Sequence, residues 1–191
     1  EDIEGYGYNG NHGYRYTYYD NGKVKTETDP ENNVHSYTYD IYGNKLTEVK
    51  PNGAIYRYEY DVMNRLSKIY FKSNASSEEI ILEEYSYAIL SGGKTKKTHT
   101  LYLDSSSTAV TSYTYDYAGR EISKQNSDGT TISTTYYANG NISTITDARG
   151  SVTYYRYDGQ NRLNEQWTPV EPSLYSYRKT TYDKAGRQKE I

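Results

Sequence analysis

The strongest constraint on the fold of this chain is an internal repeat of 21 residues, each copy of which begins at a tyrosine. The tyrosine opens a short motif in which two or three variable residues precede Gly or Asn and then a basic or polar residue. Four intervals between openings are 21 residues long, the last is 25, and Tyr87 divides the interval of 55 into 27 and 28. A constant period of this length predicts stacked copies of one small unit. The openings are Tyr18, Tyr39, Tyr60, Tyr115, Tyr136, Tyr157 and Tyr182.

The repeat also predicts the domain organisation. We expect a single array over residues 1–191, made of about eight units. The longer units are expected within residues 61–115. Since the chain begins at Glu1 rather than at Met, we interpret it as a fragment of a larger protein.

Two turn signals occur in each unit. In most units an Asp follows the opening tyrosine, and an Asp at the start of a loop accepts hydrogen bonds from backbone N–H groups just ahead of it. The Gly or Asn at the far end tolerates a positive φ. A second signal, such as Pro51-Asn52-Gly53, lies about half a period later. The residues expected to have these structural roles are Tyr39, Asp40, Gly43, Tyr60, Asp61, Asn64, Tyr115, Asp116, Gly119, Tyr136, Gly140, Tyr157, Asp158, Asn161, Tyr182, Asp183 and Gly186.

The segments between the turns have the pattern of β-strands. Residues 56–60 (YRYEY) alternate strictly between tyrosine and charge, which is typical of a half-buried strand. Two turns in each period leave two segments of roughly six residues, so each unit is predicted to be a β-hairpin. Residues 77–90 could pass as a helix by composition, but the repeat register favours a strand. We therefore predict an all-β fold in which tandem hairpins form one long curved or spiralling antiparallel sheet.

The second strand of the hairpins carries aliphatic residues three positions apart. An odd spacing would point the two side chains to opposite faces of a regular strand. A β-bulge at a constant position would return them to one face, and we favour that interpretation. The pairs are Leu46 and Val49, Leu66 and Ile69, and Ile142 and Ile145.

Composition narrows the possible classes of protein. The chain has 27 Tyr but one Phe, one Trp and no Cys, and its formal charge is only −3. An aromatic content of 15% and a small charge argue against disorder, so tyrosine is expected to supply the buried area. The interspersed charges lack the basic patch of a nucleic-acid-binding protein. No apolar run approaches the roughly 20 residues that a membrane-spanning helix requires.

The motifs resemble those of the Rhs/YD-repeat family. The resemblance rests on Tyr-Asp-x-x-Gly motifs that begin at Tyr39, Tyr115 and Tyr182, together with the period and the second turn. Two units depart from it, because Tyr19 and Tyr137 occupy the position where Asp is usual. The resemblance implies a hollow shell built from hairpins, as in polymorphic toxins, insecticidal toxin-complex cocoons and teneurins. It therefore implies a secreted or cell-surface scaffold whose partners are the rest of its own shell and an enclosed or C-terminal effector domain.

Catalytic and metal sites are not indicated by the sequence. The three histidines, His12, His35 and His99, have no metal-binding spacing. Acid pairs such as Asp29 and Asp40 could serve as the carboxylates of a glycosidase, and Asp29 could also help to bind Ca²⁺. Their recurrence as turn residues explains them better. We therefore expect no enzyme activity, no cofactor and no bound metal.

The tyrosines allow a second interpretation. Rows of exposed Tyr can stack on sugar rings, and Tyr136-Tyr137-Ala138-Asn139-Gly140 resembles the glycan-binding repeats of bacterial surface proteins. The alternative function is therefore a carbohydrate- or cell-surface-binding module. Its candidate glycan contacts are Tyr56, Tyr58, Tyr113 and Tyr155.

Overall fold

The computed structural model describes residues 3–6, 13–171 and 174–189, and these residues form β-strands joined by short turns. A single turn of 3₁₀-helix, η1 (Ser91–Gly93), interrupts them. The strands are β1 (Ile3–Tyr6), β2 (Arg15–Tyr18), β3 (Val24–Thr28), β4 (Val34–Tyr39), β5 (Lys45–Val49), β6 (Ile55–Tyr60), β7 (Leu66–Lys72), β8 (Ile80–Ile89), β9 (Thr95–Tyr102), β10 (Thr108–Tyr115), β11 (Glu121–Gln125), β12 (Thr131–Tyr136), β13 (Ile142–Thr146), β14 (Val152–Tyr157), β15 (Leu163–Glu171), β16 (Leu174–Lys179), β17 (Thr181–Tyr182) and β18 (Gln188–Lys189).

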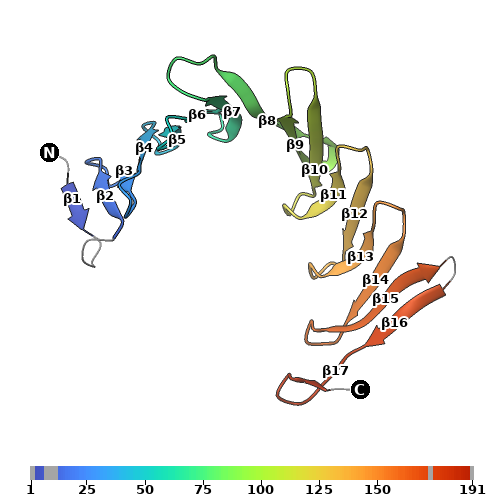
Figure 1. The fold of residues 1–191 in the computed structure, drawn as a ribbon. Helices are drawn as coiled ribbons and strands as arrows, with labels where there is room; N and C mark the ends of the chain where they lie inside the picture. Colours follow the sequence, from blue (N-terminus) through green and yellow to red (C-terminus); the bar gives the residue numbers. More distant parts are fainter. Residues whose placement is uncertain (1–2, 7–12, 172–173, 190–191) are drawn as a thin grey trace. The chain divides into compact units, whose positions relative to one another are not determined.

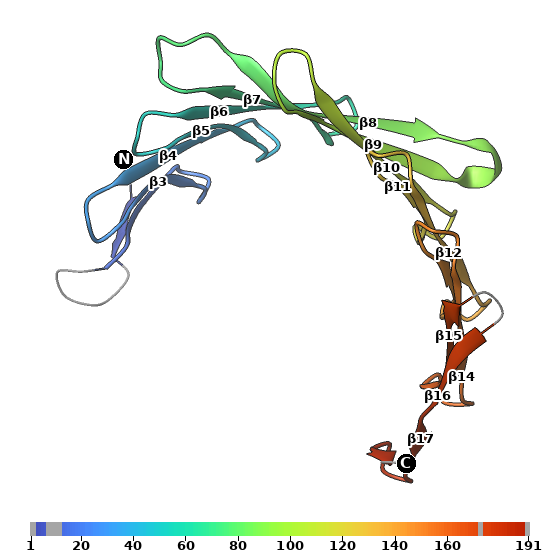
Figure 2. The ribbon, with the colours of Figure 1, turned by 45° about the vertical axis from the view of Figure 1, so that its right-hand side comes forward.

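The chain divides into two compact units, one of residues 1–86 with 99–109 and the other of residues 87–98 with 110–191. In the first unit, β1 to β8 pair with their neighbours in the chain (Figure 1). In the second unit, β10 to β16 do the same (Figure 2). All of these pairs are antiparallel, and β17 and β18 form a separate two-stranded sheet. The prediction of an all-β fold of tandem antiparallel hairpins is confirmed.

A β-bulge recurs at one position of the repeat. In each regular hairpin the second strand has one extra residue immediately after the residue that lies opposite the opening tyrosine. For example, Tyr60 lies opposite Leu66 and Glu59 lies opposite Lys68, so Ser67 is the extra residue. The predicted bulge is therefore confirmed. The extra residues are Lys25, Leu46, Ser67, Ile122, Ser143 and Asn164.

The bulge brings two of the three predicted aliphatic pairs onto the face of the sheet that carries the alternating tyrosines, which we call the tyrosine face. Leu66 lies opposite Tyr60, and Ile69 lies opposite Tyr58. Since Tyr58 and Tyr60 are two residues apart on β6, their side chains and those of their partners share one face. The same geometry places Ile142 and Ile145 opposite Tyr136 and Thr134.

The prediction was wrong for Leu46 and Val49. Leu46 is itself the extra residue of its bulge, and Val49 lies opposite Ser36 and Ile55 on the other face. Lys45 and Glu48 instead occupy the positions equivalent to Leu66 and Ile69. A one-residue shift was enough to mislead the sequence pattern, because it moves a side chain to the opposite face.

The two faces of the sheet have different chemistry. The tyrosine face carries half-buried Tyr side chains. Among the described residues, Ala54 is the one hydrophobic residue that is buried. The opposite face, which we call the hydroxyl face, carries pairs of hydroxyl side chains. The two members of a pair lie on facing strands and are hydrogen-bonded to each other. Their Oγ1 atoms are 2.7 Å apart in Thr17–Thr26, 2.6 Å in Thr38–Thr47 and 2.7 Å in Thr135–Thr144.

Candidate functional site

The aspartate of each motif organises its own turn. Oδ1 of Asp40 accepts hydrogen bonds from the backbone N–H groups of Tyr42 (2.9 Å) and Asn44 (2.8 Å). Its Oδ2 accepts a third from the Asn44 side chain at 2.8 Å. The peptide N–H of Gly43 donates back to the Asp40 carbonyl at 3.1 Å. One carboxylate thus satisfies the donors of a loop that is too short to pair them by itself.

Four other motifs place an arginine four residues after the aspartate. Its guanidinium lies against Oδ2 of the aspartate, whereas Oδ1 again accepts two backbone N–H groups. The pairs are Asp61–Arg65, Asp116–Arg120, Asp158–Arg162 and Asp183–Arg187.

These contacts lower the pKa of the motif aspartates. The Arg65 side chain is the main cause for Asp61, and the Arg120 and Arg162 side chains are the main causes for Asp116 and Asp158. The carboxylates are therefore held as anions at neutral pH. A carboxylate of this kind is a poor proton donor in general acid catalysis.

The last residue of each motif turn has a left-handed backbone. Gly or Asn occupies this position, because Gly has no Cβ and Asn adopts the left-handed region at small cost. The angles are +85° at Gly43, +63° at Asn64, +76° at Gly119, +92° at Gly140, +62° at Asn161 and +81° at Gly186.

Opening tyrosines connect one hairpin to the hairpin before it. The Tyr60 hydroxyl donates to the carbonyl oxygen of Lys45 at 2.9 Å. Lys45 immediately precedes the bulge residue Leu46, where the regular ladder of backbone hydrogen bonds is interrupted. The tyrosine therefore supplies a donor where the strand ladder does not. Two more openings make the equivalent bond, from Tyr136 to the carbonyl of Glu121 (2.7 Å) and from Tyr182 to that of Leu163 (2.7 Å).

Both motifs that have Tyr in place of Asp use it to contact the following hairpin. The Tyr19 hydroxyl donates to the carbonyl of Tyr37 at 2.8 Å, and its ring meets Tyr39 edge-on with centroids 6.2 Å apart. Tyr137 donates likewise to the carbonyl of Tyr155 at 3.0 Å. Its ring is perpendicular to that of Tyr157, at 6.3 Å. The departure from the motif therefore exchanges a turn contact for a contact between hairpins.

A polar cluster lies on the tyrosine face around Glu48, whose side chain is only 10% exposed. Lys45 Nζ lies 2.6 Å from its carboxylate, Lys50 contacts it from the other side, and the Tyr58 hydroxyl donates at 3.2 Å. Burial by itself raises the pKa of Glu48, but the hydrogen bonds from Lys45 and Lys50 prevail and lower it to about 2. Burial and the neighbouring Glu48 raise the pKa of Tyr58 to about 12.

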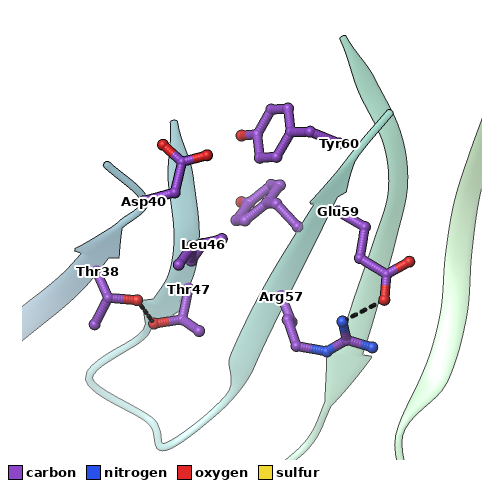
Figure 3. A pocket seen from close by; sticks show the side chains of 8 residues that line it. Thr38, Asp40, Leu46, Thr47, Arg57, Glu59 and Tyr60 are labelled. Carbon is purple, nitrogen blue, oxygen red and sulfur yellow. Dashed lines mark hydrogen bonds and ion pairs between the residues drawn. The ribbon is translucent and has the colours of Figure 1, made fainter. Parts of the chain in front are cut away.

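A groove of about 510 Å³ lies over β4, β5 and β6 (Figure 3). Its two acids already have partners. Asp40 caps its own turn, and Glu59 accepts a hydrogen bond from Arg57 at 2.7 Å. The groove is therefore lined by polar groups, but both of its carboxylates are already hydrogen-bonded to neighbouring residues. It is lined by Thr38, Asp40, Leu46, Thr47, Arg57, Tyr58, Glu59 and Tyr60.

The predicted glycan contacts lie in both units and are half-buried. Tyr56 and Tyr58 are neighbours on one face of β6, and the Tyr56 ring packs against Phe71 with centroids 5.3 Å apart. Tyr113 is on β10 and Tyr155 is on β14. The structure thus brings together only Tyr56 and Tyr58, since β10 and β14 are not neighbouring strands.

Histidine and acid placement can be stated for the described residues. His99 Nε2 lies 2.9 Å from the Glu83 carboxylate, and His35 Nδ1 lies 3.9 Å from that of Glu48. In residues 3–6, 13–171 and 174–189, no group of three or more His, Cys, Asp or Glu side chains could hold a metal ion. Asp29, the candidate glycosidase and calcium residue, caps the turn that contains Asn33. His12 lies outside the described residues.

One surface cluster was not predicted from the sequence. Tyr154, Trp167, Tyr175 and Tyr177 gather on the hydroxyl face of β14, β15 and β16. The presence of the only Trp of the chain was a signal that could have indicated it.

No helix in the described part of the chain is long and apolar enough to cross a membrane.

Comparisons with known proteins agree with the motif pattern. Residues 136–166 match the family model described as RHS Repeat, which confirms the resemblance at that part of the chain. No curated protein matches the chain. Over 92% of its length it is similar to a chain of the crystal structure of TcdB2-TccC3, with 14% identity and a TM-score of 0.41. It is also similar over 92% of its length to a chain of the Photorhabdus luminescens Tc holotoxin pore, with 14% identity and a TM-score of 0.40. The chain spans 12% of the length of each of these two chains.

Proposed function

We propose that this chain is a non-enzymatic wall segment of a larger β-shell, in a secreted or surface protein that encloses or presents a C-terminal toxin or effector domain. The observation that carries the proposal is the match of residues 136–166 to the RHS Repeat family, because this family is a structural repeat. The fold agrees with such a role, since β1 to β8 and β10 to β16 form tandem hairpins in which consecutive strands pair.

The side-chain contacts support a scaffold, because they recur along the repeats rather than gathering at one site. The same capped turn recurs in both units, and the tyrosine-to-carbonyl bond is made by Tyr60 in the first unit and by Tyr136 and Tyr182 in the second. Repeat proteins of this kind derive their stability from neighbour-to-neighbour contacts, so a wall can be extended by adding units. The motif residues from Tyr39 to Gly186 would then act as the structural elements of the wall.

Limited proteolysis of the longer parent protein tests this function. In the folded parent we expect the polypeptide that follows the repeats to resist a protease of broad specificity, because the shell excludes the protease. The same polypeptide expressed without the repeats should be cut rapidly. Equal rates of cleavage in the two contexts would contradict the proposed enclosure.

A further inference from the structure

Within the second unit the hydroxyl face changes its chemistry at β14. On β12 and β13 it carries hydroxyl pairs such as Thr135 and Thr144. The register then places Tyr154 opposite Trp167, and Trp167 opposite Tyr177. Three rings therefore form a row across three strands, at the strand spacing of roughly 4.8 Å.

Tyr175 extends this row into a broader surface, which we call the aromatic platform (Tyr154, Trp167, Tyr175 and Tyr177). The rings of Tyr154 and Tyr175 approach each other with centroids 6.3 Å apart, and those of Trp167 and Tyr177 with centroids 5.3 Å apart. The platform is open, because Tyr154 is 43% exposed, Tyr175 45% and Tyr177 50%. Each of its four side chains carries a polar atom at the ring, so the surface suits a ligand that remains partly hydrated.

A charged row lies beside the platform, two residues away from the aromatic row on each of the three strands. Arg156 lies opposite Glu165, and Glu165 lies opposite Lys179. The Arg156 guanidinium is 4.8 Å from the centre of the Trp167 ring, and the Tyr177 hydroxyl donates to Glu165 at 3.1 Å. The side chain of Arg156 is 67% exposed, so its donors can turn to a ligand.

We propose that the aromatic platform binds a linear saccharide of pyranose units. A pyranose ring is amphipathic, with C–H groups on its faces and hydroxyls at its edge. The rings would contact the C–H faces, whereas Arg156, Glu165 and Lys179 would hydrogen-bond the hydroxyls as both donors and acceptors. Single-stranded nucleic acid also stacks on aromatic side chains, but it needs a continuous cationic track. Here Glu165 stands between the two cations.

Trp167 fluorescence provides a direct test, since the chain has no other tryptophan. The 191-residue chain would be titrated with chitohexaose and with cellohexaose while its emission is recorded. At least one of them should shift the emission with a dissociation constant below about 1 mM. Tyr177→Ala and Tyr154→Ala should each weaken binding about tenfold or more. Tyr177→Phe retains the ring and should retain most of the affinity.

The matched control is Tyr117→Ala, since Tyr117 is 82% exposed but lies in a turn away from the platform. It should bind as tightly as the unmodified chain, and circular dichroism would establish that each variant is folded. Arg156→Gln leaves all four rings in place and should also weaken binding. The proposal is overturned by the absence of a shift with both sugars at about 10 mM. It is also overturned if folded Tyr154→Ala and Arg156→Gln proteins bind unchanged, or if oligothymidylate binds more tightly than either sugar.

Discussion

One backbone angle decides which residues can end the motif turn. Gly43, Gly119 and their equivalents have a positive φ, and Asn64 and Asn161 adopt the same conformation at +63° and +62°. Asn accepts this region at small cost, but a β-branched residue does not. The alternation of Gly and Asn at one repeat position is thus a conformational requirement.

Replacing a turn glycine by valine should destabilise the chain more than a change within a strand. We expect Gly43→Val and Gly119→Val each to cost about 1–3 kcal/mol of unfolding free energy through backbone strain. Thr47→Val is the comparison, because Thr47 lies in a β-strand whose conformation valine favours, and the change removes only an exposed hydrogen bond to Thr38. Chemical unfolding midpoints measure the difference, and equal midpoints would contradict the role of these glycines.

Asparagine gives a second comparison at the same position. Gly119 has open space where a Cβ would be added, so Gly119→Asn meets no steric obstacle there. We expect Gly119→Asn to retain most of the stability that Gly119→Val loses, because the two replacements differ in their tolerance of positive φ. If both variants unfolded at the same denaturant concentration, strain would not be the cause.

Hairpins are joined by side chains as well as by strand pairing. The bulge interrupts the backbone ladder next to Lys45, and the Tyr60 hydroxyl from the following hairpin reaches that carbonyl. This contact accounts for the tyrosine at positions 60, 136 and 182, since phenylalanine has the same ring but no donor. Most of the apolar burial would remain in a phenylalanine variant.

Removing the Tyr60 hydroxyl should therefore weaken the junction between two hairpins. Tyr60→Phe is expected to lower the unfolding free energy by about 0.5–1.5 kcal/mol. Tyr117→Phe is the matched control, because Tyr117 is highly exposed and should tolerate the change. A thermal unfolding series that shows no difference between these two variants would count against the tyrosine-to-carbonyl bond.

Lowering the pH should remove the stabilising contribution of the cluster around Glu48. The pKa of Glu48 is lowered from 4.5 to about 2 in the folded chain, so its ionised form stabilises the fold. That contribution is present above pH 4.5 and is lost as the pH falls toward 2. Glu48→Gln should therefore be less stable at neutral pH and should show a shallower loss of stability between these pH values. Parallel pH profiles for the two proteins would show that Glu48 does not contribute.

At the scale of the whole molecule, the strands at the ends of a sheet determine whether the chain can pair with another chain. β16 (Leu174–Lys179) is exposed along its length and is the last strand of its sheet. An unpaired edge presents backbone donors and acceptors that can pair with another chain. At the other end, the stretch 7–10 beside β1 lies outside the described residues.

We expect the isolated chain to self-associate through its edges as its concentration rises. Sedimentation over a range of concentrations measures this, and Leu174→Lys should reduce it because a lysine on an edge strand opposes pairing. Val62→Lys is the control, since Val62 is fully exposed in a turn rather than on an edge. A strict monomer at millimolar concentration would show that the edges are protected.

The sequence by itself determined the local architecture of this protein. A 21-residue period, the Asp after each opening tyrosine and the Gly or Asn at the end of each turn predicted antiparallel hairpins, because these signals act within a few residues of one another. The bulge was also predictable from the odd spacing of Leu66 and Ile69, whose positions relative to Tyr60 and Tyr58 confirm it.

Only the tertiary structure decided which side chains meet across strands. Leu46 was assigned to the wrong position of the repeat, and the bond from Tyr60 to the Lys45 carbonyl was not foreseen. The row of Tyr154, Trp167 and Tyr177 likewise depends on the pairing of three strands. Such contacts depend on register, and a shift of one residue reverses the face of every side chain on a strand.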